Sequence, residues 1–221
     1  MESKLFTPVT FGPLTLRNRT IRSAAFESMC PGNAPSDMLL NYHRSVAAGG
    51  IGMTTVAYAA VTRSGLSFDR QLWMRPEIIP GLRRLTDAVH AEGAAAGIQL
   101  GHCGNMSHKS ICGCTPVGAS GGFNLYSPTF VRGLRVDELP ELARAYGRSV
   151  NLAREAGFDA VEIHAGHGYL ISQFLSPATN HRKDEFGGSL QNRMRFMDMV
   201  LEEVMKAAGS DMAVLVKMNM R

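Results

Sequence analysis

Residues 161–196, VEIHAGHGYLISQFLSPATNHRKDEFGGSLQNRMRF, decide how the rest of the sequence is interpreted. The segment begins as an alternating apolar run that is typical of a strand, and His164 stands at the end of that run. The loop that follows presents His167 and Tyr169. Two imidazoles and a phenol within a few positions at a strand end predict a site for hydrogen bonding and proton transfer.

Strand-like and helix-like segments alternate on both sides of this stretch. Apolar runs predict five strands, and helical spacing predicts the segments between them, one of them capped by Ser36. Such alternation predicts parallel strands with right-handed crossovers, in a doubly wound sheet or a (β/α)8 barrel. The strands are expected at residues 20–26, 51–61, 94–100, 158–165 and 212–219, and the helices at 37–48, 79–92, 138–156 and around 196–204.

The barrel is the favoured architecture. No G-x-G-x-x-G motif follows the first strand, which argues against a dinucleotide-binding sheet. Gln99, His164 and Lys217 lie at the carboxyl ends of strands, where the active sites of barrels are found. Residues 7–18 carry a Gly-Pro turn between short alternating runs, so we expect a hairpin there that plugs the barrel floor.

The length of the chain bears on its domain organisation. A barrel needs eight strands and about 250 residues, whereas 221 residues accommodate five predicted strands. We therefore expect residues 1–221 to be the N-terminal part of a single TIM-barrel domain of class α/β, with strands six to eight absent. No linker or composition shift suggests a second domain.

Composition and charge restrict the classes of partner. The chain is 45% hydrophobic and 19% charged with a net charge of +4, and its basic residues are scattered. This pattern favours a solvated surface over a nucleic-acid interface. No signal pattern opens the sequence and no apolar run reaches the ~20 residues that cross a bilayer, so we expect a cytoplasmic protein without a membrane partner.

The four cysteines predict neither a disulfide framework nor a metal site. Cys30 and Cys103 stand apart, and Cys112 and Cys114 form a CGC motif. The C-x8-C-x-C spacing of the last three matches no ordinary zinc pattern. We expect free thiols, as in a reducing compartment.

The two imidazoles and the phenol at the strand end are suited to polarising a carbonyl group. Two imidazoles can hold one oxygen while negative charge grows on it, and the phenol of Tyr169 can give a proton to a neighbouring carbon. Each group taken alone is better explained by packing or a backbone hydrogen bond. Together, His164, His167 and Tyr169 favour catalysis.

At this point a resemblance becomes plain. HAGHGYLISQFLSPATNHRKDEFGGSLQNRMRF closely resembles the signature of the old yellow enzyme family of FMN-dependent ene-reductases, H-x-[AG]-[HN]-G-Y-L-x-x-Q-F-L-x-P-x-x-N-x-R-x-D-x-[YF]-G-G-S-x-[EQ]-N-R. Upstream, LRNRTIRSAA, GGIGMTTVAYAAV and IQLGHCG resemble the first three strands of that family. The resemblance covers essentially the whole chain. It implies FMN as the cofactor, NAD(P)H as the reductant and a small activated alkene, such as an α,β-unsaturated carbonyl compound, as the substrate.

The resemblance also assigns roles to individual residues. His164 and His167 correspond to the substrate-anchoring pair, and Tyr169 corresponds to the proton donor. Gln99 and Lys217 correspond to flavin-binding positions near the pyrimidine edge and the N1–C2=O end. Ala24 and Ala57 fall where small residues let the backbone approach the flavin, although ordinary strand packing explains them equally well.

Two departures qualify the resemblance. Phe26 stands where many members carry a Thr or Cys that tunes the flavin, and its context RSAAFES resembles the branch of 2,4-dienoyl-CoA and 2-enoate reductases. The phosphate-binding loops after strands seven and eight of the family lie outside these 221 residues. The signature residues between 182 and 193 are expected to hold the loop after the fourth strand and the start of the next helix in place, rather than to take part in catalysis.

Two alternatives remain open at this stage. A metal-dependent barrel lyase or hydrolase would use His102, His164 and His167 as ligands, but it would leave Gln99 and Lys217 without a role. The second is a non-catalytic, incomplete barrel that folds by association. A homo-oligomer is compatible with either interpretation.

Overall fold

A five-stranded parallel sheet forms the centre of the computed structural model, which describes residues 3–125 and 127–219. All five predicted strands occur in it. The first strand is shorter than predicted, because beyond Arg22 the carboxylate of Glu27, rather than a neighbouring strand, accepts the N–H of Ala57 at 3.2 Å. The strand order is β10 (Ala213–Met218), β9 (Ala160–Ala165), β5 (Ala95–Gly101), β4 (Met53–Ala60), β3 (Ile21–Arg22).

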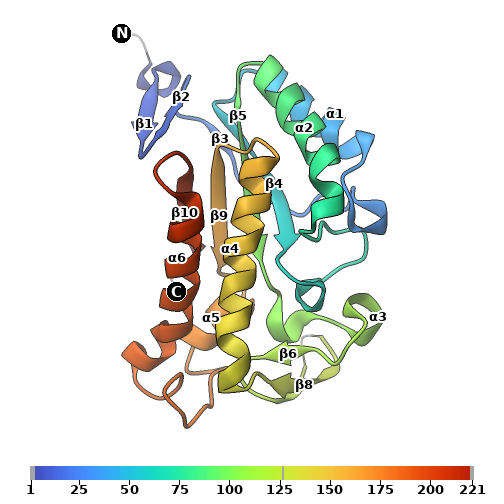
Figure 1. Cartoon of the computed structure of the whole chain (residues 1–221), viewed down its shortest axis with the longest axis vertical. Coiled ribbons are helices and arrows are strands. Elements are labelled where there is room, and N and C mark those ends of the chain that lie inside the picture. Colours follow the sequence, from blue (N-terminus) through green and yellow to red (C-terminus); the bar gives the residue numbers. More distant parts are fainter. Residues whose placement is uncertain (1–2, 126, 220–221) are drawn as a thin grey trace.

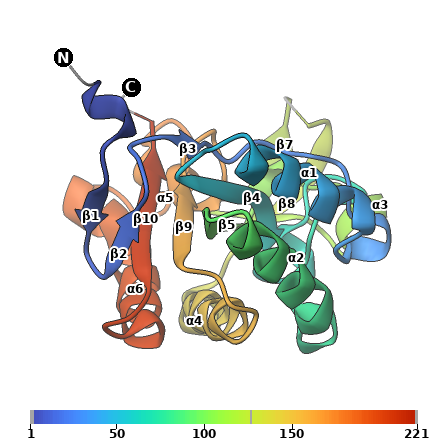
Figure 2. The same cartoon turned by 90° about the horizontal axis from the view of Figure 1, so that it is seen from above.

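Four long helices lie along one face of this sheet (Figures 1 and 2). Two of them begin at serine caps: the Ser36 hydroxyl accepts from Leu39 N at 3.2 Å, and the Ser189 hydroxyl accepts from Asn192 N at 3.2 Å. A side-chain oxygen at this position satisfies a backbone N–H that the first helical turn leaves free. The helices are α1 (Asp37–Ala48), α2 (Ile79–Ala91), α4 (Leu139–Glu155) and α6 (Leu190–Ala208).

The main core lies between these helices and the sheet. Every residue of β4 is buried, which is typical of a strand in a parallel sheet covered on both faces. Val56 and Ile98 of the sheet and Leu85 and Val150 of the helices have no exposed surface. The alternation of strands and helices thus fixes the carboxyl ends of all five strands at the same edge.

The predicted hairpin lies at the opposite edge. It consists of β1 (Val9–Phe11) and β2 (Leu14–Leu16), which pair antiparallel across Gly12 at φ 54°. Leu16 packs with Met53 and Ala213, the first residues of β4 and β10. The expectation of a plug at the amino ends of the strands is confirmed.

The carboxyl ends carry short elements that no pattern in the sequence predicts. A small sheet of order β6-β8-β7 covers this side of the molecule (Figure 1). Its strands are β6 (Val117–Gly118), β7 (Gly122–Asn124) and β8 (Thr129–Gly133), and the short helices nearby are α3 (Lys109–Cys112) and α5 (Leu170–Leu175). Single 3-10 turns complete the structure: η1 (Lys4–Phe6), η2 (Pro31–Asn33), η3 (Arg63–Gly65), η4 (Pro76–Ile78), η5 (Gly104–Met106) and η6 (Val136–Glu138).

Signature residues beyond Tyr169 hold these short elements to the barrel. The buried guanidinium of Arg182 pairs with Asp184 at 2.7 Å and donates to the carbonyl of Ala119 at 2.9 Å. Arg193 donates to Leu175 O at 2.7 Å. These contacts tie the loop after α5 to the small sheet and to the start of α6, which agrees with the architectural role expected for this part of the signature.

Candidate active site

His164, His167 and Tyr169 meet at the carboxyl end of β9. The ring of His164 lies 4.9 Å from the rings of both His167 and Tyr169. The turn that brings them together places His167 in the left-handed region at φ 56°, a conformation that costs energy for a residue with a side chain. His164 is buried, whereas His167 is exposed and Tyr169 is half-buried.

The hydrogen bonds of His164 indicate a neutral ring with its proton on Nε2. Its Nδ1 accepts from the N–H of Gly166 at 3.3 Å, and its Nε2 lies 3.2 Å from Nδ1 of His167. Burial, together with the charges of His167 and Lys217, lowers the pKa of His164 to about 3. Near neutral pH the ring therefore donates an N–H without carrying a charge.

The phenol of Tyr169 keeps its proton at neutral pH. Burial raises the pKa of Tyr169, and the opposing hydrogen bond from Ser67 does not offset this. The Ser67 hydroxyl lies 3.4 Å from the Tyr169 oxygen and 3.2 Å from that of Tyr58. The site thus pairs a neutral N–H donor at His164 with a protonated phenol at Tyr169.

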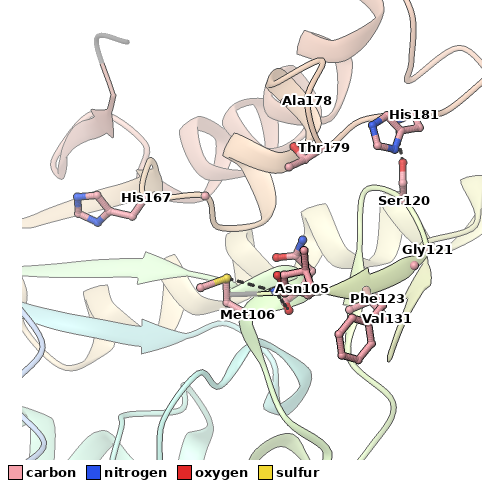
Figure 3. Close-up of a pocket in the computed structure, with 14 residues that line it drawn as sticks. Asn105, Met106, Ser120, Gly121, Phe123, Val131, His167, Ala178, Thr179 and His181 are labelled. Atoms are coloured by element: carbon pink, nitrogen blue, oxygen red, sulfur yellow. Dashed lines mark hydrogen bonds between the residues drawn. The ribbon is translucent and has the colours of Figure 1, made fainter. Parts of the chain in front are cut away.

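Two cavities of about 490 Å³ each border this cluster, one lined by His167 and the other by Tyr169. The His167 cavity is shown in Figure 3, where His167 and His181 lie at opposite sides of the labelled residues. The Tyr169 cavity reaches the phenol. The His167 cavity is lined by Asn105, Met106, Phe123, Val131, His167 and Thr179, among others, and the Tyr169 cavity by Ser67, Phe68, Met106, His108, Ile111 and Tyr169, among others.

The residues expected to bind a cofactor lie at the same end of the sheet. Gln99 is buried and donates from Nε2 to Glu162 Oε1 at 2.6 Å. Lys217 stands in register with His164 on the neighbouring strand, and its Nζ donates to the carbonyl of Ala24 at 3.0 Å. Because Ala24 follows β3 and Lys217 belongs to β10, this bond joins the two edge strands across the mouth of the curved sheet.

The small residues Ala24 and Ala57 are both buried, with 7% and 6% of their surface exposed. They pack in one apolar cluster with Tyr58 and, at its border, Tyr169. The residues that were singled out for substrate or cofactor thus lie in or shortly after β3, β4, β5, β9 and β10, in the carboxyl-terminal half of the sheet.

Three further residues shape the site and were not singled out from the sequence. Ser67 contacts the phenol, and Glu162 orients the Gln99 amide. Glu27 forms a buried ion pair with Arg22 at 2.6 Å behind Ala57. Glu162 lies two residues before His164 on the same strand, a period-2 signal that could have placed it on the same face.

Phe26 lies at the mouth, where it is 41% exposed. It stacks on Phe68 with ring centroids 4.7 Å apart, and Phe68 lines the Tyr169 cavity. The phenyl ring at the position where the related signature carries a polar residue therefore packs behind Phe68, which lines that cavity.

The alternative metal site is not formed. Within residues 3–125 and 127–219 no group of three or more His, Cys, Asp or Glu side chains is placed to hold a metal ion. His102 is buried, its Nδ1 accepts from Gly104 N at 3.0 Å and its Nε2 lies 3.1 Å from the Ser64 hydroxyl. Both ring nitrogens are therefore engaged away from His164 and His167. In the same described part of the chain, no helix is long and apolar enough to cross a bilayer.

Comparison with known proteins places this site in a family. The model of the NADH:flavin oxidoreductase / NADH oxidase family matches residues 4–221. The chain is 44% identical over 216 residues to the 4,4'-dithiodibutanoate disulfide reductase of Rhodococcus erythropolis, covering 98% of this chain and 54% of that protein. It is 37% identical over 209 residues to the NADPH dehydrogenase of Bacillus subtilis, covering 92% and 60%.

A solved structure shows the same architecture. The old yellow enzyme homologue of Zymomonas mobilis superposes with a TM-score of 0.89 at 30% identity, covering 97% of this chain and 63% of that one. The expected (β/α) barrel class is thereby confirmed, with this chain spanning between about half and two thirds of the length of these three proteins. With a family match over residues 4–221 and the His–His–Tyr cluster at the end of β9, the chain belongs to the NADH:flavin oxidoreductase / NADH oxidase family, which includes the old yellow enzymes.

Proposed function

We propose that this chain carries the substrate and flavin face of an FMN-dependent oxidoreductase, which uses NAD(P)H to reduce the C=C bond of α,β-unsaturated carbonyl compounds. The observation that carries the proposal is the cluster of His164, His167 and Tyr169. The ring centre of His164 lies 4.9 Å from that of His167 and 4.9 Å from that of Tyr169, so two imidazoles and one phenol are in contact. Residues 1–221 constitute, in this proposal, the N-terminal part of one barrel domain.

The residues at the mouth fit FMN by the chemistry of their donors. Gln99 offers an amide, and Lys217 offers a cation, both suited to the polar edge of an isoalloxazine ring. Ala24 and Ala57 present small buried side chains beside them. When bound, FMN supplies a carrier that accepts two electrons from a nicotinamide and delivers them to an alkene.

Substrate orientation falls to the imidazoles. The Nε2–H of neutral His164 and a ring N–H of His167 bind the carbonyl oxygen and stabilise negative charge that grows there. The His167 cavity receives the remainder of the molecule. Its lining is mainly apolar, with Met106, Phe123 and Val131 facing an organic substrate and the amide of Asn105 beside them.

Tyr169 delivers the proton to the α-carbon. Its raised pKa keeps the phenol protonated until a carbon of sufficient basicity is presented. Ser67, which contacts both Tyr169 and Tyr58, orients the phenol. The Tyr169 cavity gives solvent a route by which the phenolate regains its proton.

The proposal is tested with the purified full-length protein and FMN. Absorbance in the flavin bands should appear, bleach under NADPH or NADH in the absence of oxygen, and return on addition of 2-cyclohexenone. A protein that stays colourless after incubation with FMN, or a reduced flavin that an enone does not reoxidise, would overturn it.

A second substrate class is favoured by one relative. The protein from Rhodococcus erythropolis is a disulfide reductase by name, and it is 44% identical over 98% of this chain. Reduction of a disulfide releases thiolates, whose conjugate acids have pKa values near ~8.5, so the leaving group needs no proton from a phenol. Tyr169→Phe should therefore slow enone reduction while leaving disulfide reduction nearly unchanged. Equal slowing of both would refute this second candidate.

A further inference from the structure

A pair of thiols lies outside the site described above. Cys112 ends α3 and Cys114 follows it across Gly113, and the two Sγ atoms are 3.6 Å apart. Gly113 has φ 75°, the left-handed conformation that glycine adopts without strain. This turn brings the sulfurs to within about 1.6 Å of the ~2.05 Å length of a disulfide bond.

The two thiols differ in access. Cys112 is 2% exposed, whereas Cys114 is exposed to solvent. An accessible sulfur beside a buried one is the arrangement in which the first attacks an external disulfide and the second resolves the product. All four cysteines are free thiols in the structure.

One arginine lies against the turn that holds the pair, and a second is near enough to affect the charge of Cys114. The guanidinium of Arg63 lies directly over Gly113, so that a Cβ added there would be 3.2 Å from its Nη2. Burial and the neighbouring Cys112 raise the pKa of Cys114, and the charges of Arg63 and Arg132 oppose that rise. Nearby arginines stabilise the thiolate, which is the form that attacks.

We propose that Cys112 and Cys114 form a redox-active dithiol that exchanges with small disulfides able to reach the exposed Cys114. The Cys114 thiolate attacks one sulfur of R–S–S–R, a mixed disulfide forms, and R–S⁻ leaves and takes up a proton. The Cys112 thiolate then attacks the Cys114 sulfur, and the second R–S⁻ leaves. In sum, two electrons and two protons pass from the dithiol to the disulfide, giving one Cys112–Cys114 bond and two R–SH. This reaction needs neither flavin nor nicotinamide, so it stands apart from the proposed alkene reduction.

The other two cysteines provide an internal comparison. Cys30 and Cys103 are 4% and 0% exposed. Burial raises the pKa of each to about 12, which leaves almost no thiolate at neutral pH. Any fast exchange with an external disulfide therefore falls to the CGC motif.

The experiment treats the reduced protein with glutathione disulfide at neutral pH, blocks the remaining thiols and maps the tryptic peptides by mass spectrometry. Cleavage after Lys109 places Cys112 and Cys114 on peptide 110–132, and Cys103 on peptide 85–109. We expect peptide 110–132 to be two hydrogens lighter than the reduced peptide and to carry no blocking group. Peptide 85–109 should carry a blocking group on Cys103. A bond between the two peptides, or a peptide 110–132 blocked at both cysteines, would overturn the proposal.

Single variants separate the two steps. Cys112→Ser should stop at a stable mixed disulfide of Cys114 with glutathione, because the resolving thiol is gone. Cys114→Ser should slow the reaction of peptide 110–132 by at least about tenfold, because the remaining thiol is buried. A wild-type protein that also stops at the mixed disulfide would contradict the resolving role of Cys112. A Cys114→Ser variant that reacts at the wild-type rate would contradict the attacking role of Cys114.

Discussion

Tyr169→Phe separates proton donation from every other role of this side chain. The substitution removes one oxygen whose protein partner, Ser67, lies 3.4 Å away, near the outer limit of a hydrogen bond. Its loss should lower the free energy of unfolding by less than ~1 kcal/mol. The ring contacts with His164 at 4.9 Å and with Tyr58 at 5.4 Å are retained by phenylalanine.

The kinetic effect should be much larger than the effect on stability. Loss of a general acid slows a proton transfer by about 10²- to 10⁴-fold, which corresponds to ~3–5 kcal/mol in the barrier at 1.36 kcal/mol per tenfold. Reduction of the flavin by NAD(P)H requires no proton from the phenol. Stopped-flow measurement of the two half-reactions should therefore show slow reoxidation by an enone and reduction at nearly the wild-type rate.

Tyr146→Phe provides the matched control. Tyr146 is fully buried in the main core, and its hydroxyl has no hydrogen-bond partner in the described part of the chain. Removing a buried, unsatisfied hydroxyl should leave both half-reactions unchanged and raise the free energy of unfolding by about 1 kcal/mol. If Tyr169→Phe slowed both half-reactions equally, the phenol would serve to shape the site and the assignment as proton donor would be refuted.

Three further predictions concern stability and the cofactor. Arg182→Met should lower the free energy of unfolding, measured in urea, by about 3 kcal/mol. The reason is that Asp184 and the carbonyls of Ala119 and Leu134 lose their partner. A decrease of less than about 1 kcal/mol would show that the ion pair is dispensable. Burial holds the folded pKa values of His102 and His164 at about 3, so the unfolded chain takes up protons first as the pH falls from 6.5. Acidification should therefore lower the free energy of unfolding by up to ~1.4 kcal/mol per pH unit for each of the two histidines. His164→Asn should remove about half of this pH dependence, and an unchanged pH dependence would contradict the prediction. Lys217→Met should weaken FMN binding at least about tenfold in a fluorescence titration through loss of the cation, whereas an unchanged affinity would exclude contact with the flavin.

The sequence predicts the regular elements of this fold because their signals are local. The strands β4, β5, β9 and β10 are long apolar runs, the four long helices carry clear 3.6-residue periodicity, and the predicted cap at Ser36 is formed. β3 is shorter than predicted because residues 23–26 could extend it only by hydrogen bonding to the backbone of β4. The N–H of Ala57 in β4 donates instead to the carboxylate of Glu27. The β6–β8 sheet was missed because strands of two to five residues, rich in glycine, show no period.

The site was predictable where its functional side chains are neighbours along the sequence. It was not predictable where side chains from distant segments complete it. His164, His167 and Tyr169 are close along the chain, and the signature around them identifies the family. Ser67 reaches Tyr169 from 102 positions away, and its segment carries no motif. Likewise, the rejection of His102 as a metal ligand depends on its bonds to Ser64 and Gly104, which no spacing rule predicts.

The charge distribution at the mouth explains why a neutral imidazole at His164 suits the proposed reaction. Lys217 lies in register with His164, and a second positive charge on that buried ring would be opposed both by burial and by the lysine. At His164 the substrate oxygen therefore meets an N–H dipole rather than an imidazolium. Such donors bind a neutral carbonyl weakly and an enolate-like oxygen strongly, so most of their effect appears as the negative charge develops. A protonated His164 would instead be a strong acid at the carbonyl oxygen, in competition with Tyr169 for proton delivery. Holding the pKa of His164 at about 3 while raising that of Tyr169 thus assigns hydrogen bonding to the imidazole and proton transfer to the phenol.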